Sequence, residues 1–184
     1  MGNFYVNHVV VEADHDGVLA ELRRIGRGGY CSETVGGNVY VYDNESESQD
    51  ENVIERLAVD LSRLKCRSVF AFLNHDDDVL VIWVASDGEI VDRFNSCPDY
   101  FNEQMLETPT PTGGDPAVMA DAAGVSERAD DVAKVLGERD PFAIFQHQGL
   151  AEALGFEPEF CLIGANAFPR GETAGEVDEV TVVI

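Results

Sequence analysis

The order of apolar and polar residues in the first hundred positions switches between a strand pattern and a helix pattern. Residues 4–12 are rich in valine and aromatic residues and predict a strand. Two stretches then place apolar residues on one helical face. The first stripe consists of Val18, Leu19, Leu22 and Ile25, and the second of Val53, Ile54, Leu57, Ala58, Leu61 and Leu64. The pattern predicts two amphipathic helices.

Residues that favour helix starts and tight turns bound these segments. Asp14 or Asp16 can cap the first helix, and Ser48 or Asp50 can cap the second. Between the helices, residues 35–39 read V-G-G-N-V, with glycines where a tight hairpin needs positive φ. We therefore expect two short strands joined by a hairpin between the helices.

Two later runs are apolar at almost every position. Residues 69–73 and 79–85 have no polar alternation, which is typical of strands buried on both faces. Residues 89–95 alternate again and predict an edge strand. The order matches a ferredoxin-like β-α-β-β-α-β core extended by an antiparallel hairpin. The expected fold class is therefore α+β.

The chain is expected to form a single domain over residues 1–184. A sheet-forming core spans residues 1–101, an irregular connection 102–114, and a mainly helical extension 115–184. A chain of this length can bury roughly 70% of its unfolded surface. Because the central strands need cover on both sides, the C-terminal helices are predicted to cover the second face of the sheet.

Helix starts in the extension are easy to recognise. Asp115–Pro116 and Asp140–Pro141 each place a capping carboxylate before a proline at the first helical position. A helix is predicted over residues 142–154. Residues 160–163 and 177–183 are predicted as strands because they are rich in apolar and β-branched residues.

Charge narrows the classes of partner. The chain has 35 acidic and 12 basic residues, for a net charge of −23. Such a surface repels nucleic acid and anionic lipid, since binding to either depends on Lys and Arg. Two explanations stay open: solubility in a salty cytoplasm, where charge repulsion is screened, or attraction of a cationic partner, such as a basic protein.

Targeting signals and cysteine motifs add little. No apolar run approaches the ~20 residues needed to cross a bilayer, and the first residues have no basic or cleavable signal. A cytoplasmic location is therefore expected. Cys31, Cys66, Cys97 and Cys161 form no C-x-x-C pair and are expected to be buried free thiols.

The segment L-N-H-D-D-D at residues 73–78 raises the question of a metal site. His75, Asp76 and Asp78 could ligate a cation and serve a metal-assisted hydrolase. However, adjacent side chains of an extended chain point to opposite faces, and no calcium-loop pattern follows. Asp and Asn also favour tight turns because they tolerate left-handed backbone. A hairpin turn is the favoured interpretation, and no cofactor is expected.

Other candidate groups give no catalytic set. His8 lies on an apolar strand and His147 within a helix, without any H-E-x-x-H pairing. Cys97 has only Arg93 as a basic neighbour to lower its pKa. The sequence therefore predicts no catalytic residue.

The segment F-N-S-C-P-D-Y-F at residues 94–101 has two interpretations. Its aromatic side chains could hold the loop against the core, or they could anchor a partner, because aromatic residues dominate interface energetics. The second interpretation assigns partner binding to Pro98, Asp99, Tyr100 and Phe101.

Three stretches carry a resemblance. L-N-H-D-D-D-V-L, D-G-E-I-V-D-R-F-N-S-C-P-D-Y-F and F-Q-H-Q-G-L-A-E-A-L-G-F resemble an uncharacterised family of bacterial proteins. The resemblance implies no activity and no cofactor, so no functional residue is carried over. In general type, the chain is similar to small acidic bacterial immunity proteins, which neutralise toxins.

These observations predict a non-enzymatic, acidic protein that binds a macromolecular partner. An immunity-like inhibitor of a basic toxin is the most concrete form of this hypothesis. The alternatives are a metal-assisted hydrolase at the 75–78 turn and a protein that binds a small ligand between the sheet and the C-terminal helices. The sequence leaves the oligomeric state open.

Overall fold

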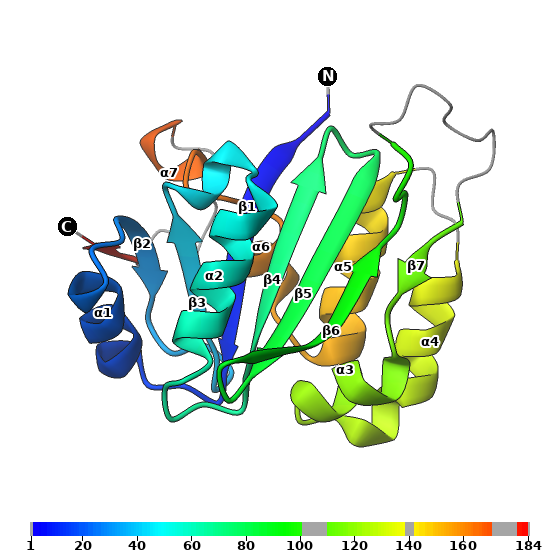
Figure 1. The fold of residues 1–184 in the computed structure, drawn as a ribbon, viewed down its shortest axis with the longest axis horizontal. Coiled ribbons are helices and arrows are strands. Elements are labelled where there is room, and N and C mark those ends of the chain that lie inside the picture. Colours follow the sequence, from blue (N-terminus) through cyan, green and yellow to red (C-terminus); the bar gives the residue numbers. More distant parts are fainter. Residues whose placement is uncertain (1, 101–109, 139–141, 171–179, 184) are drawn as a thin grey trace.

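The structure is a computed structural model that describes residues 2–100, 110–138, 142–170 and 180–183. Within these ranges the chain forms one antiparallel sheet of eight strands, in the order β7-β6-β5-β4-β1-β3-β2-β8 (Figure 1). The strands are β1 (Phe4–Val11), β2 (Gly29–Ser32), β3 (Val39–Asp43), β4 (Ser68–His75), β5 (Val79–Ser86), β6 (Glu89–Asn95), β7 (Thr112–Gly113) and β8 (Val180–Val183). The predicted α+β class is confirmed.

Seven α-helices and two 3-10 helices accompany the sheet in the described ranges. The α-helices are α1 (His15–Arg24), α2 (Glu51–Leu61), α3 (Pro116–Ala122), α4 (Ala129–Gly137), α5 (Ala143–Leu154), α6 (Pro158–Cys161) and α7 (Ala167–Arg170). The 3-10 helices are η1 (Ser46–Ser48) and η2 (Ser126–Arg128). Figure 1 shows α1 and α2 on one face of the sheet, called the front face, and α3 to α6 on the back face.

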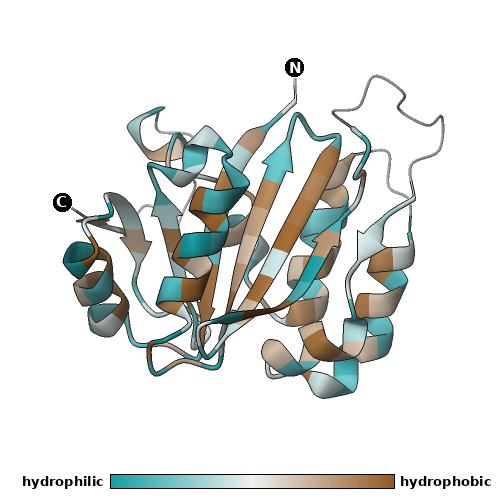
Figure 2. Ribbon diagram, in the orientation of Figure 1, coloured by the Kyte–Doolittle hydropathy of each residue, from teal (hydrophilic) through white to brown (hydrophobic). Residues whose placement is uncertain are grey.

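Each face of the sheet carries its own hydrophobic core. On the front face, Leu22 of α1, Leu57 of α2 and Trp83 of β5 belong to one cluster. On the back face, Phe72 of β4 and Leu150 of α5 belong to a more aromatic cluster. β4 and β5 are buried at nearly every position, as their uninterrupted apolar runs predict (Figure 2). Both faces of these two strands are therefore covered over most of their length.

Local side-chain chemistry fixes the helix starts. Asp14 caps α1 by accepting the Gly17 N–H at 3.0 Å, and Asp50 caps α2 by accepting the Asn52 N–H at 2.9 Å. Asp115 caps α3, as predicted, with Pro116 in the first turn. Each cap accepts a backbone N–H that has no partner within its helix. The predicted start at Asp140–Pro141 lies outside the described residues.

Three predictions at the sheet margins need correction. Residues 160–163 do not form a strand: Phe160 and Cys161 end helix α6, which begins at Pro158 and directs Phe160 into the back core. Within the predicted connection, Thr112–Gly113 forms β7, which pairs with the last two residues of β6. Among the described residues, β6 is paired on this side only at Phe94 and Asn95, and β7 rather than β6 is the outermost strand. The predicted C-terminal strand is present as β8, while residues 177–179 lie outside the described ranges.

Candidate functional site

The triple aspartate forms the tight turn between β4 and β5. Asp76 and Asp77 have φ of 53° and 59°, and the Asp78 N–H donates to the His75 carbonyl at 3.0 Å. Two consecutive left-handed residues are the signature of a two-residue hairpin turn that matches the twist of the strands. The structure therefore has the hairpin turn that the sequence favours.

The three carboxylates of this turn accept hydrogen bonds from different groups. Asp76 accepts the Gly2 N–H at 2.9 Å, and Asp77 accepts the Asn3 N–H at 3.0 Å. Asp78 accepts the Tyr100 hydroxyl at 2.9 Å. These contacts hold the turn against the start of β1 and the segment after β6.

The residues named for a metal-assisted reaction do not converge on one point. His75 Nδ1 lies 2.6 Å from Gln49 Oε1, whereas Asp76 and Asp78 bond to groups in other segments. Over the part of the chain that the structure describes, no group of three His, Cys, Asp or Glu side chains could hold a metal ion. His75, Asp76 and Asp78 thus form no built ligand set.

The segment predicted to bind a partner lies beside this turn. The Tyr100 ring is half-buried, packs against the front core and makes an edge contact with the His75 ring at 5.7 Å between centroids. Pro98 is exposed and Asp99 is half-buried. Phe101 lies outside the described residues. The structure brings Pro98, Asp99 and Tyr100 together with the triple aspartate.

A cleft of about 290 Å³ opens on the front face next to these residues. It lies between the start of α2 and the ends of β4, β5 and β6 nearest the turn. Its lining residues are Ser48, Gln49, Glu51, Leu73, His75, Val79, Val81, Asn95, Cys97 and Pro98. The cleft thus has an apolar floor from β4 and β5 and a polar rim.

The electrostatic environment of the cleft is negative. Burial raises the pKa of the Cys97 thiol, and the charges of Asp99 and Asp78 raise it further. The hydrogen bond to Asp78 raises the pKa of Tyr100, and the charges of Asp78 and Asp76 add to this effect. Burial and these negative charges both disfavour a thiolate and therefore oppose nucleophilic chemistry at Cys97. The same negative charges would attract a cation to the cleft.

Exposed aromatic side chains surround the same turn. Phe4 is 49% exposed and its ring lies 4.9 Å from that of His75. Phe142 and Phe145 are 49% and 52% exposed and contact each other at 5.9 Å between centroids. The Ala143 N–H donates to the Asp77 carbonyl, which joins the start of α5 to the turn. We call the surface formed by Phe4, Asp76, Asp78, Tyr100, Phe142 and Phe145 the turn end.

Phe145 was missed as a surface residue by the sequence pattern. The sequence predicts the helix over residues 142–154 but does not identify Phe145 as exposed; α5 buries Gln146 and His147, while Phe145 is 52% exposed. Gln146 Nε2 donates to the Val135 carbonyl at 3.3 Å, and His147 Nδ1 lies 2.9 Å from the Tyr5 hydroxyl. Each of these buried polar side chains thus has one partner on a distant element, while His147 Nε2 has none among the described residues. These contacts allow α5 to bury Gln146 and His147 and to expose Phe145.

The two histidines on apolar elements are core residues. His8 is fully buried, with Nε2 3.3 Å from the Ile54 carbonyl, and burial lowers its pKa to about 4. His147 is also fully buried, and burial lowers its pKa to about 3. Neither ring reaches solvent. The four cysteines are free thiols, of which only Cys66 is partly exposed.

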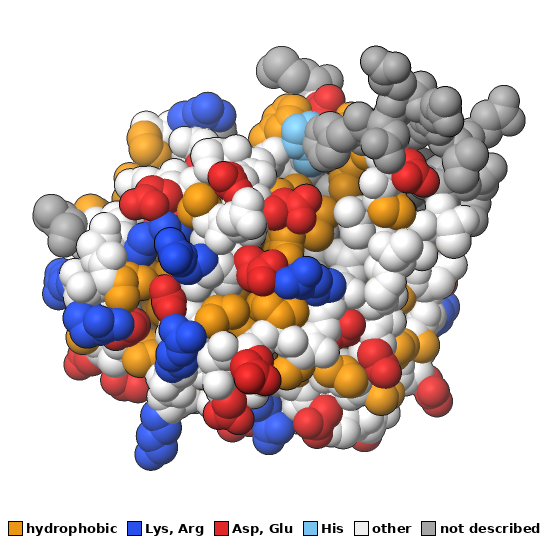
Figure 3. All heavy atoms as spheres, in the orientation of Figure 1, with side chains coloured by type: hydrophobic (Ala, Val, Ile, Leu, Met, Phe, Trp, Pro, Cys, Tyr) orange, Lys and Arg blue, Asp and Glu red, His pale blue; other side chains and the backbone are white. Residues whose placement is uncertain are grey.

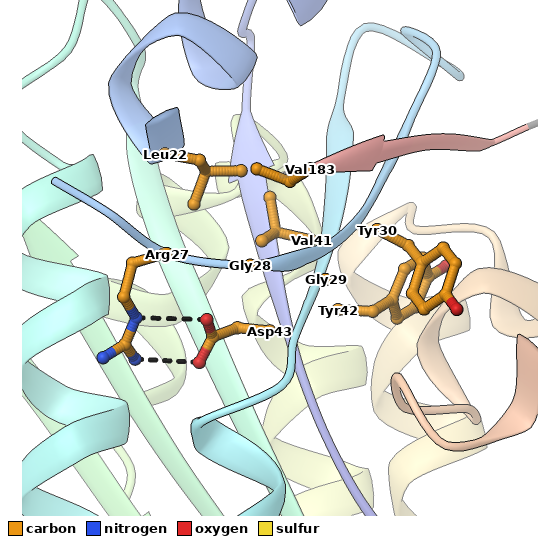
Figure 4. Close-up of a pocket in the computed structure, with 9 residues that line it drawn as sticks. All are labelled: Leu22, Arg27, Gly28, Gly29, Tyr30, Val41, Tyr42, Asp43 and Val183. Atoms are coloured by element: carbon orange, nitrogen blue, oxygen red, sulfur yellow. Dashed lines mark hydrogen bonds and ion pairs between the residues drawn. The ribbon is translucent and has the colours of Figure 1, made fainter. Parts of the chain in front are cut away.

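A different part of the front face carries paired charges. Arg27 donates to Asp43 through Nε at 3.1 Å and Nη2 at 2.8 Å (Figure 4). The crevice drawn in Figure 4 is too narrow to hold a water molecule. Arg27 also pairs with Glu45 at 2.6 Å, so the charges compensate one another here. The carboxylates of the turn, in contrast, have no Lys or Arg partner among the described residues.

Comparison of the chain with protein-family models, curated proteins and solved structures gave no significant match. The fold and the site define an α+β protein with an antiparallel eight-stranded sheet and an acidic, aromatic surface at one end. The resemblance to a bacterial family stays a prediction. Across the described ranges, none of the helices has the length and apolar character to span a membrane.

Proposed function

We propose that this protein is a non-enzymatic binding protein whose turn end recognises a basic macromolecular partner. The observation that carries this proposal is the clustering of exposed aromatic rings with carboxylates at one end of the sheet. Of the five large apolar side chains that are exposed in the described ranges, three, Phe4, Phe142 and Phe145, lie around the β4–β5 turn.

The chemistry of this surface suits a cationic protein. Aromatic side chains supply large contact areas and are enriched among residues that dominate binding energy. The net charge of −23 would attract a basic partner over long range, and the carboxylates at the turn would orient it. An immunity-like inhibitor of a basic toxin is the most concrete form of this function.

Hydrogen bonds fix the β4–β5 turn within the turn end before any partner binds. Asn74 Nδ2 donates to both the Asn3 carbonyl and the Asp77 carboxylate at 2.9 Å. Together with the bonds from Gly2 and Asn3, this network fixes the turn. Preorganisation reduces the entropy lost on binding and supports a role in recognition.

A capture experiment tests the proposal. The wild-type protein, the double variant Phe4→Ser/Phe145→Ser and the control Val91→Ser/Val182→Ser would be incubated with a cell lysate at low and high salt. Val91 and Val182 are as exposed as the phenylalanines but lie on β6 and β8. We expect to capture a basic protein that binds the wild type and the control but does not bind the Phe4→Ser/Phe145→Ser variant. High salt should release this protein. A bound protein that ignores the Phe4/Phe145 change, or no salt-sensitive partner, would contradict the proposal.

We also propose that β1-α1-β2-β3-α2-β4 is a ferredoxin-like unit to which the remaining elements were added. The strand order β4-β1-β3-β2, with antiparallel neighbours throughout, supports this topology. The position of α1 and α2 on the same face supports it as well (Figure 1). In this view β5 and β6 extend the unit and lengthen the end that carries the site.

A further inference from the structure

We infer that the front-face cleft beside the turn receives one lysine or arginine side chain of the partner. This inference rests on the proposed function and names what that site would recognise. The aliphatic stem would lie on the apolar floor, and the cationic group would meet the carboxylates at the rim.

The floor suits an aliphatic stem. Leu73, Val79 and Val81 come from neighbouring positions of β4 and β5 and present their side chains to the cleft. Long cationic side chains bury their methylene groups along apolar surface while their charged ends stay in polar surroundings. Pockets for drug-sized ligands start at about 300 Å³. A cleft of about 290 Å³ lies at the lower end of this range and has room for one long side chain.

The rim supplies a carboxylate without a partner. Glu51, the first residue of α2, is exposed, lines the cleft and has no hydrogen bond or ion pair among the residues with described placement. Asp78 and Asp99 lie close enough to Cys97 to act on it electrostatically. A cation entering the cleft would meet Glu51 directly, and the nearby charges of Asp78 and Asp99 would add to the attraction.

Among the described residues, no Lys or Arg pairs with Glu51 or Asp78. Arg93, on the same face of β6, donates to Glu55 at 2.7 Å, one helical turn beyond Glu51. Of the described residues that line the cleft, His75 alone is basic, and its Nδ1 faces Gln49 Oε1. Figure 3 shows acidic side chains beside exposed apolar ones on this face. Charge complementarity thus favours a cationic occupant over an anionic or neutral one.

A titration followed by NMR tests the inference. N-acetyl-lysine amide and N-acetyl-arginine amide would be added to the full chain, with N-acetyl-norleucine amide as the uncharged control of similar stem length. We expect saturable shifts of the methyl signals of Leu73, Val79 and Val81 with the cationic probes. The norleucine probe should bind several-fold more weakly. Added salt should weaken the cationic probes alone, because it screens exposed charges.

Matched variants test whether the carboxylate of Glu51 binds the cationic group of the probes. Glu51→Gln should weaken the cationic probes about fivefold, the size of effect expected for one solvent-exposed ion pair. Glu127→Gln, the same change on η2, should leave binding unchanged. Equal binding of norleucine and lysine probes, absence of methyl shifts, or no effect of Glu51→Gln would overturn the inference.

The outcome separates this inference from the proposed function. One outcome is a captured partner that binds the Glu51→Gln variant as tightly as the wild type but fails to bind the Phe4→Ser/Phe145→Ser variant. In that case the turn end binds the partner and the cleft does not. If the cationic probes occupy the cleft but no partner depends on the turn end, the proposed function fails and the cleft chemistry stands.

Discussion

The two faces of the sheet are covered to different extents, and the difference places the candidate site. On the back face, α3 to α6 cover a cluster rich in aromatic residues, including Phe70, Phe156 and Phe160. On the front face, two helices cover a mostly aliphatic cluster and leave the cleft open near the β4–β5 turn. A sheet that is closed on one side and partly open on the other provides a rigid floor with an accessible surface.

A fully buried histidine on each face sharpens this comparison. His8 on the front face lies near the charges of Asp43 and Arg27, while burial alone lowers the pKa of His147 on the back face. His8 Nδ1 and His147 Nε2 lack hydrogen-bond partners among the described residues. The front face therefore tolerates charge in its interior, whereas the back face is a neutral core.

The largest expected effect is a difference between two leucines on opposite faces. Leu80→Ala would leave a void in the closed back core and should lose stability in the upper half of the range of about 2–5 kcal/mol for such changes. Leu73→Ala lines the open cleft, where water can replace the lost atoms, and should fall in the lower half. Urea unfolding measures both. Equal losses would mean that the cleft is closed in solution.

The next effect tests the charge within the front face. Asp43 is fully buried and accepts bonds from Arg27 and from both the N–H and the hydroxyl of Ser46. Asp43→Asn should cost about 2–3 kcal/mol, less than a fully buried pair, because Arg27 is partly exposed and keeps Glu45. The control Asp60→Asn removes an exposed pair with Arg63 and should cost under about 1 kcal/mol. Thermal unfolding of both variants measures these losses, and equal losses would contradict the prediction.

Acidification tests the back-face histidine. The folded pKa of His147, about 3, lies below its unfolded value of 6.5, so the unfolded chain binds more protons between these values. Stability from this group is therefore lost as the pH falls below about 6.5, by about 2 kcal/mol at pH 5. The variant Tyr5→Phe/His147→Leu removes the ring and its hydroxyl neighbour, and should lose this part of the pH dependence. Unfolding curves at pH 7 and pH 5 measure the difference, and an unchanged slope would be inconsistent with a neutral buried ring.

The smallest effect compares two tyrosine hydroxyls. The Tyr42 hydroxyl donates to the Phe160 carbonyl at 2.9 Å in the back core, and the Tyr100 hydroxyl donates to Asp78 at the open end. Tyr42→Phe leaves a buried carbonyl without its donor and should cost about 1–1.5 kcal/mol. Tyr100→Phe should cost about 0.5 kcal/mol or less because water can replace the hydroxyl. Chemical unfolding would contradict this ranking if Tyr100→Phe cost more.

Local patterns in the sequence predicted much of the fold. The runs that form β4 and β5 are apolar at nearly every position, and this pattern alone predicts strands buried on both faces. Asp50 and Asp115 cap helices through bonds two or three residues away, and the turn at Asp76 needs only its neighbours. Features set by nearby residues could be predicted.

Features set by distant residues could not. The cleft is lined by Gln49 and Asn95, which are far apart in the chain and lie near each other because α2 packs over the sheet beside β6. The helix α5 turns Phe145 outward because Tyr5, at the other end of the chain, provides a partner for His147. The spacing of apolar residues along the chain does not show which polar side chains find a partner on a distant element.

The close contact at Gly2 has a practical consequence for any binding assay. A Cβ atom on residue 2 would lie 2.1 Å from the Asp76 carbonyl oxygen, so glycine alone lets the backbone pass the turn at this distance. An affinity tag fused next to Gly2 would therefore be attached beside Asp76, within the turn end. The last strand, β8, lies at the far edge of the sheet (Figure 1), so a handle attached beyond it would leave the turn end free for immobilised measurements.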